Sequence, residues 1–135
     1  MNAKSIDFIV YEVSDVGKSV AFYRDILGLD FQYFNDEADW SEFLVGETTI
    51  ALCGPGAAKW GAPRKTTPPT VDFKGEAAIA LAVDDIKTAV AELREKEVSF
   101  AVDIKDSGVC YFAVLTDPDG NRVWLHQGYA DYHNE

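Results

Sequence analysis

An internal repeat constrains the fold of this chain more than any other feature of its sequence. Residues 13–16, Val-Ser-Asp-Val, return 70 positions later as Val-Asp-Asp-Ile at residues 83–86. Each copy follows an apolar run typical of a strand and precedes a stretch with the apolar spacing of a helix. A repeat of this length indicates one supersecondary unit used twice. Any site between the two copies would therefore draw equivalent positions from both.

Apolar spacing and turn residues predict the same order of elements in both halves of the chain. An apolar stripe from Val16 to Leu27 predicts the first helix, and Asp85 is the expected cap of its copy. Apolar and aromatic runs between turn residues predict the strands. The predicted elements are strand 7–14, helix 15–28 and strands 29–34, 40–45 and 48–53, then strand 77–84, helix 85–97 and strands 98–104, 109–116 and 121–127. The sequence therefore predicts an α+β fold of two tandem βαβββ modules.

The length of 135 residues fits a single domain with one substantial core. We expect this domain to span residues 1–135. Its predicted parts are module one at residues 5–54, a linker at 55–75, module two at 76–128 and a C-terminal tail at 129–135. The linker is rich in Gly, Pro, Ala and Thr and contains Trp60, so it is either a plain connector or a loop that covers a pocket.

The overall charge and composition exclude several classes of partner. A net charge of −11 argues against nucleic acid, because binding to a phosphate backbone requires a basic face. No apolar run reaches the roughly 18 residues of a membrane span. Cys53 and Cys110 do not make a disulfide framework, and the N-terminus lacks the apolar stretch of a signal peptide, so we expect a cytoplasmic protein. The acidic balance either attracts cationic ligands or serves solubility alone.

Two motifs resemble the signatures of a known superfamily. Residues 13–15 followed by 21–29 (Ala-Phe-Tyr-Arg-Asp-Ile-Leu-Gly-Leu) resemble the opening signature of the vicinal oxygen chelate superfamily. Residues 117–121 (Asp-Pro-Asp-Gly-Asn) resemble its closing signature. The superfamily includes glyoxalase I, extradiol dioxygenases, fosfomycin-resistance enzymes and bleomycin-resistance proteins. The resemblance implies the glyoxalase/bleomycin-resistance fold, in which curved mixed sheets enclose a central cavity, and it implies a homodimer.

In the enzymes of that superfamily, a His on the first strand and a Glu on the last strand of each module hold a divalent metal, which polarises substrate oxygens. Carried over through the signatures and the repeat, the equivalent positions are Phe8, Ala51, Ala78 and Trp124. None offers a lone pair suited to such a cation, so we expect no metal and no cofactor. Two interpretations stay open. In the first, the large rings of Phe8 and Trp124 pack beside the small side chains of the two alanines and fill the former metal position. In the second, the two rings line an apolar pocket.

Strand alternation adds further candidates. Three residues are expected to share a face with the former ligand positions, namely Glu12, Ala80 and His126. His126 and Glu12 could act as acid and base. Trp40 lies in an unusually aromatic strand, but the pattern does not decide which side of that strand faces inward. Trp60 could cover the cavity from the linker.

The leading hypothesis is a metal-free small-molecule binding protein that sequesters an aromatic or cationic compound. Its predicted ligand-binding residues are Phe8, Glu12, Trp40, Ala51, Trp60, Ala78, Ala80, Tyr111, Trp124 and His126. One alternative is a glyoxalase- or dioxygenase-like enzyme with a non-standard catalytic site around His126 and Glu12. A second alternative is a degenerate module whose cavity is plugged.

Overall fold

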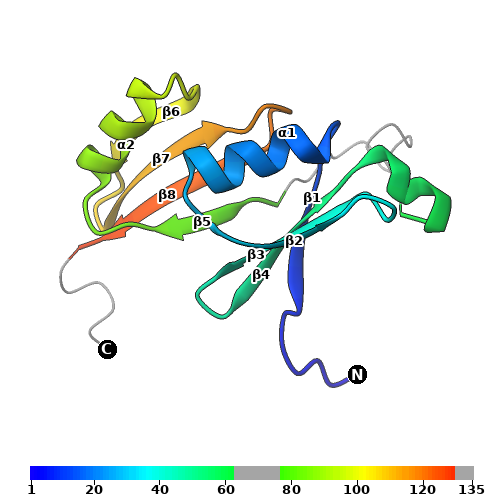
Figure 1. Cartoon of the computed structure of the whole chain (residues 1–135). Coiled ribbons are helices and arrows are strands. Elements are labelled where there is room, and N and C mark those ends of the chain that lie inside the picture. The colour runs from blue at the N-terminus through cyan, green and yellow to red at the C-terminus, as the bar shows by residue number, and fades with distance from the viewer. Residues whose placement is uncertain (63–76, 130–135) are drawn as a thin grey trace, which may run out of the picture. The chain divides into compact units, whose positions relative to one another are not determined.

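The structure is a computed structural model that describes residues 1–62 and 77–129. The chain divides into two compact units, residues 1–75 and 76–135, and each is described by itself. Both units contain the predicted order of a strand, a helix and three further strands (Figure 1). None of the helices in the described ranges is both long enough and apolar enough to cross a membrane. Most of the predicted linker and tail lies outside the described residues.

The first unit forms a four-stranded mixed sheet with three helical segments. Its elements are β1 (Phe8–Glu12), α1 (Val16–Ala21), η1 (Phe22–Ile26), β2 (Asp30–Asn35), β3 (Trp40–Val45), β4 (Thr48–Cys53) and η2 (Pro55–Trp60). The strand order is β1-β4-β3-β2, with β1 parallel to β4 and the other pairs antiparallel.

The predicted single helix over residues 15–28 is wrong in one respect. It is an α-helix followed by the π-helical turn η1, and Leu27 N donates a hydrogen bond to Phe22 O over 3.0 Å. Two successive rings, Phe22 and Tyr23, are buried in this segment. The wider π-helical turn directs both rings toward the core. An ordinary α-helical turn would separate two successive side chains by a larger angle around the helix axis.

The second unit repeats this plan. Its elements are β5 (Ile79–Ala82), α2 (Ile86–Glu95), β6 (Phe100–Asp106), β7 (Cys110–Thr116) and β8 (Arg122–Gly128). The strand order is β5-β8-β7-β6, again with one parallel pair at the first strand. Asp85 caps α2 by accepting a hydrogen bond from Thr88 N (3.2 Å), as predicted, and Asp15 caps α1 in the same way through Lys18 N (3.1 Å). The predicted α+β fold of two βαβββ modules is confirmed.

The core of each unit lies between its helix and one face of its sheet. In the first unit, Tyr23 and Phe43 are fully buried with their ring centroids 6.1 Å apart. In the second, Leu115 and Val123 of the sheet are fully buried, and Leu93 of α2 is buried. Burying one such apolar side chain stabilises the fold by about 1.5–3 kcal/mol. We call the face of each sheet that is opposite to this core the open face.

Candidate ligand-binding site

The strand register defines which side chains share the open face of the first sheet. Phe43 and Ser41 point into the core, so their neighbours along β3 point to the open face. Cross-strand partners share a face, and β4 is paired with β1 on one side and β3 on the other. The open face therefore carries Phe8, Val10, Glu12, Trp40, Glu42, Leu44, Thr49, Ala51 and Cys53. The predicted residues Phe8, Glu12, Trp40 and Ala51 are among them.

Three aromatic side chains gather on this face. The Phe8 and Trp40 rings meet edge to face, with centroids 5.5 Å apart and an interplanar angle of 89°. Trp60, from η2, packs on the same indole with centroids 5.8 Å apart at 66°. We call Phe8, Trp40 and Trp60 the aromatic cluster. Phe8 is 47% exposed and Trp60 52% exposed, so the cluster presents ring surface rather than filling the core of its own unit.

A carboxylate is fixed beside the aromatic cluster. One oxygen of Glu42, Oε2, accepts hydrogen bonds from Trp40 Nε1 (2.8 Å) and from the Tyr33 hydroxyl (2.9 Å). The hydrogen bond to Glu42 raises the pKa of Tyr33 above its ordinary value, and burial and the charge of Glu42 act in the same direction. Because both donors hold the same oxygen, the carboxylate has a defined orientation next to the half-buried indole of Trp40. Such an arrangement suits a planar group that carries a positive charge.

The open face of the second sheet carries an aromatic pair. Trp124 lies between Ala80 and Val114 in the register, and its ring stacks on Phe112 with centroids 5.1 Å apart at 24°. A cavity of about 190 Å³ adjoins this pair; its lining residues are Ala101, Val102, Phe112, Val114, Arg122 and Trp124. Trp124 is 39% exposed, so within its own unit it is not packed into the core.

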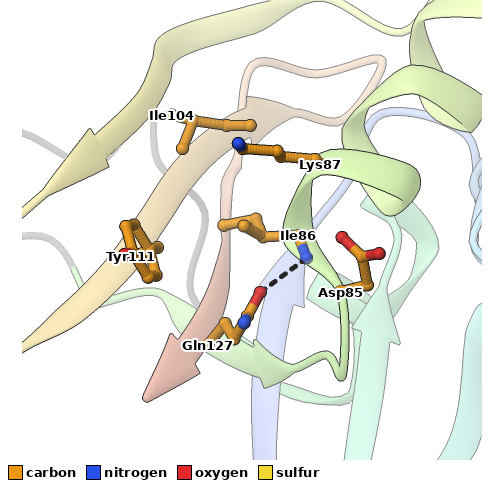
Figure 2. Close-up of a pocket in the computed structure, with 6 residues that line it drawn as sticks. All are labelled: Asp85, Ile86, Lys87, Ile104, Tyr111 and Gln127. Atoms are coloured by element: carbon orange, nitrogen blue, oxygen red, sulfur yellow. Dashed lines mark hydrogen bonds between the residues drawn. The ribbon is translucent and has the colours of Figure 1, made fainter. Parts of the chain in front are cut away.

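Tyr111 lies on the other face of the second sheet. It pairs with Gln127 in the register and lines a pocket of about 250 Å³ at the start of α2 (Figure 2). The Gln127 side chain accepts a hydrogen bond from Ile86 N over 2.8 Å across this pocket. The structure therefore separates Tyr111 from Trp124, although both were predicted to bind the ligand. Ala78 is exposed just before the start of β5.

The proposed acid and base stand on different units. Glu12 is half-buried opposite Cys53 on the first sheet. His126 is half-buried between Ala82 and Phe112 on the second sheet. Neither unit by itself brings the two together, so their joint catalytic role stays a prediction.

The positions equivalent to metal ligands do not fit a metal. The register places Ala51 and Trp124 at matching points of β4 and β8, as the repeat predicted, and Phe8 lies on the open face beside them in the first unit. Phe8 and Ala51 have only carbon side chains, and the indole nitrogen of Trp124 donates but does not coordinate. Within residues 1–62 and 77–129, His, Cys, Asp and Glu side chains nowhere gather in a group of three or more that could hold a metal ion.

Sequence reasoning missed three features of the site. The spacing of Trp40 and Glu42 on one strand indicates a shared face, yet their hydrogen bond was not predicted. Phe112 was overlooked, although alternation places it two residues from Val114 on the same face. The contact between Trp60 and Trp40 joins residues far apart in sequence, and no local pattern signals it.

Comparisons with known proteins show the same superfamily and fold. The sequence profile of the Glyoxalase/Bleomycin resistance protein/Dioxygenase superfamily matches residues 5–125. The metallothiol transferase FosB of Staphylococcus epidermidis is 31% identical over 134 residues, covering 95% of this chain and 84% of that protein. The crystal structure of TnmS3, an antibiotic binding protein from Streptomyces sp. CB03234, superposes with a TM-score of 0.73 at 25% identity, covering 96% of this chain and 99% of that one. FosX from Listeria monocytogenes shares the fold, with a TM-score of 0.68 at 15% identity, covering 97% of this chain and 95% of that one.

Proposed function

This chain belongs to the Glyoxalase/Bleomycin resistance protein/Dioxygenase superfamily, and we propose that it is a metal-free binding protein for a planar aromatic compound with a positive charge. The observation that carries the proposal is the exposed aromatic cluster next to the fixed carboxylate of Glu42. Exposed apolar patches of this kind commonly mark binding sites, and the oriented charge beside this one selects for a cationic group.

Each part of the site contributes a different interaction. The Phe8 and Trp60 rings stand at steep angles to Trp40, so they present separate walls to a flat molecule. A stacked aromatic contact contributes about 0.5–1.5 kcal/mol beyond the area it buries. Glu42 Oε2 is engaged by two donors, which leaves Oε1 as the oxygen that a cationic group meets. The net charge of −11 attracts cations to the protein as a whole.

One solved structure supports a binding role. TnmS3 is described as an antibiotic binding protein, and this chain is similar to it over nearly its whole length. We therefore place the ligand in the class of bulky aromatic compounds, which includes many antibiotics. The family resemblance also leads us to propose a homodimer, which sedimentation equilibrium tests directly.

A second candidate function is enzymatic. The identity of 31% with a metallothiol transferase favours it. It would require a non-standard site, in which His126 and Glu12 act as acid and base or help to hold a metal away from Phe8, Ala51, Ala78 and Trp124. This candidate predicts that the metal-stripped protein binds a divalent metal stoichiometrically and that His126→Ala abolishes the binding while the protein stays folded.

Calorimetry with two matched ligands tests the proposed function. We would titrate 9-aminoacridine, a planar cation at neutral pH, and acridine, its neutral analogue, into metal-stripped protein. We expect saturable binding of the cation, weakened about fivefold in Phe8→Ala through the loss of about 1 kcal/mol of ring contact. Phe34→Ala is the matched control, because Phe34 is 37% exposed on the opposite face of the sheet and should not affect binding. Absence of saturable binding, or equal losses in the two variants, would refute the proposal.

A further inference from the structure

We propose that Asp39 is a positioning residue for the ligand site, because it fixes the segment that carries Trp60 and so makes Trp60 a preformed wall of the aromatic cluster. This inference rests on the proposed function. It assigns a binding role to a residue outside the cluster that holds the turn between β2 and β3 against η2.

The backbone conformation of Asp39 is fixed by the turn between β2 and β3. Asp39 has a φ of 55°, in the left-handed region that few residues other than Gly, Asn and Asp adopt. Its N–H donates to Asp36 O (3.3 Å), and Ala38 N donates to the Asn35 side chain (3.0 Å), which closes the turn. The turn therefore points the carbonyl and the carboxylate of Asp39 out of the hairpin, where η2 begins.

Asp39 holds the first turn of η2 with two hydrogen bonds. Its carbonyl oxygen accepts from Gly54 N over 2.9 Å. Its carboxylate oxygen Oδ2 accepts from Gly56 N over 2.8 Å. One residue thus satisfies two backbone donors at the start of a short helical segment, where such donors have no partner within the helix. A bond from a carboxylate to a backbone N–H is among the stronger hydrogen bonds in proteins.

The Asp39 side chain lies so close to the start of η2 that residues 54 and 56 have to be glycine. A Cβ at Gly54 would lie 2.3 Å from Asp39 Oδ2 and 2.5 Å from its Cγ. A Cβ at Gly56 would lie 3.0 Å from the Cβ of Asp39. Gly54 has an ordinary φ of −90°, which any residue can adopt. Glycine is therefore needed at position 54 because a side chain would clash with Asp39, and not because of the backbone conformation. The Gly54-Pro55-Gly56 segment is therefore shaped to receive the Asp39 side chain.

The other end of η2 returns to the same turn. Trp60 Nε1 donates to Ala38 O over 2.9 Å, so the indole is fixed next to the residue that precedes Asp39. Its ring then meets Trp40 at 66° and leaves half of its surface exposed. An exposed indole would otherwise sample several rotamers, and a ligand would have to immobilise it on binding. By fixing η2, the hydrogen bonds of Asp39 help to hold the Trp60 indole in one rotamer in the free protein, so the ligand does not lose affinity by ordering it.

A double-mutant cycle tests the inference. Asp39→Ala removes the carboxylate acceptor and places an alanine at a left-handed φ of 55°. Both changes loosen the hold on η2, and we expect the variant to bind 9-aminoacridine about fivefold more weakly, as for one side chain that must be ordered on binding. In a Trp60→Ala background the same substitution should have almost no effect. Asp39→Asn should rescue binding, because asparagine keeps an oxygen acceptor and adopts the left-handed conformation. Asp36→Ala is the matched control, since only the backbone carbonyl of Asp36 takes part in the turn.

A second readout does not depend on the ligand. Protein labelled with 5-fluorotryptophan gives one fluorine NMR signal for each of its three tryptophans. Asp39→Ala and Gly54→Ala should both shift or broaden the Trp60 signal, whereas Asp36→Ala should leave it unchanged. If wild-type protein does not bind 9-aminoacridine, the proposed function fails and the ligand role of Asp39 fails with it. If wild-type protein binds but the Asp39 and Trp60 effects add, or the Trp60 signal does not move, the inference alone is overturned.

Discussion

Replacing Glu42 with glutamine separates charge from shape at the aromatic cluster. The two donors of the wild-type site, Trp40 Nε1 and the Tyr33 hydroxyl, meet the same carboxylate oxygen. A glutamine side chain can present its carbonyl oxygen at that place and keep both hydrogen bonds. A cation about 4 Å from the carboxylate gains from ~1 kcal/mol in bulk water to ~4 kcal/mol near a protein surface. Because Glu42 is only half-buried, we take the lower value, which corresponds to about fivefold in affinity.

Calorimetry with the two acridines measures this difference. Glu42→Gln should weaken 9-aminoacridine binding about fivefold and leave acridine binding unchanged, and added salt should reduce the difference between wild type and variant. Glu37→Gln, in the exposed turn of the same hairpin, controls for net charge. Equal weakening of both ligands would show that the substitution disturbs the shape of the site, and an unchanged affinity for the cation would refute the role of Glu42.

Two further predictions concern the folded state. Phe43→Ala removes a fully buried ring between Tyr23 and Phe31 and should lower the free energy of unfolding in urea by about 3–5 kcal/mol, whereas a loss under 1 kcal/mol would contradict the assigned core. The hydrogen bond to Asp106 raises the pKa of Tyr129 from its ordinary value of 10.0 to about 12. From neutral pH up to about pH 10 this bond therefore stabilises the folded state, and its contribution is lost as the pH rises toward 12. The same bond lowers the pKa of Asp106, so the contribution is also lost in acid, where that carboxylate becomes protonated. Ultraviolet titration against Tyr129→Phe measures that pKa, which Asp106→Asn should return toward 10; no change in that variant would contradict the assignment.

The architecture could be predicted because it is encoded in periodic patterns. Helical spacing after Asp15 and Asp85, together with turn residues between the strands, fixes the order of elements in each half. The interior of the first helix was harder, because the π-helical turn at Phe22 depends on how two successive rings enter the core. No apolar period distinguishes that turn from an ordinary helical one.

The site could be predicted only in part. The family signatures and the repeat pointed to Phe8, Ala51 and Trp124 as equivalent positions, and the register places each of them on the open face of its sheet. Alternation could not choose between the two sides of β3, because each side mixes polar and apolar residues and only the burial of Phe43 decides. The position of Trp60 depends on contacts between the hairpin turn and η2, which follow from tertiary packing and not from local sequence.

One measurement tests the central claim most directly, namely that this protein binds a planar cation without a metal. Calorimetric titration of 9-aminoacridine into metal-stripped protein would be repeated after addition of one equivalent of nickel, zinc or manganese. We predict saturable binding with the same affinity in every case, because the aromatic cluster and Glu42 need no metal to form the site. Binding that appears only after metal addition, or a metal that itself binds stoichiometrically, would contradict the account and favour the enzymatic alternative.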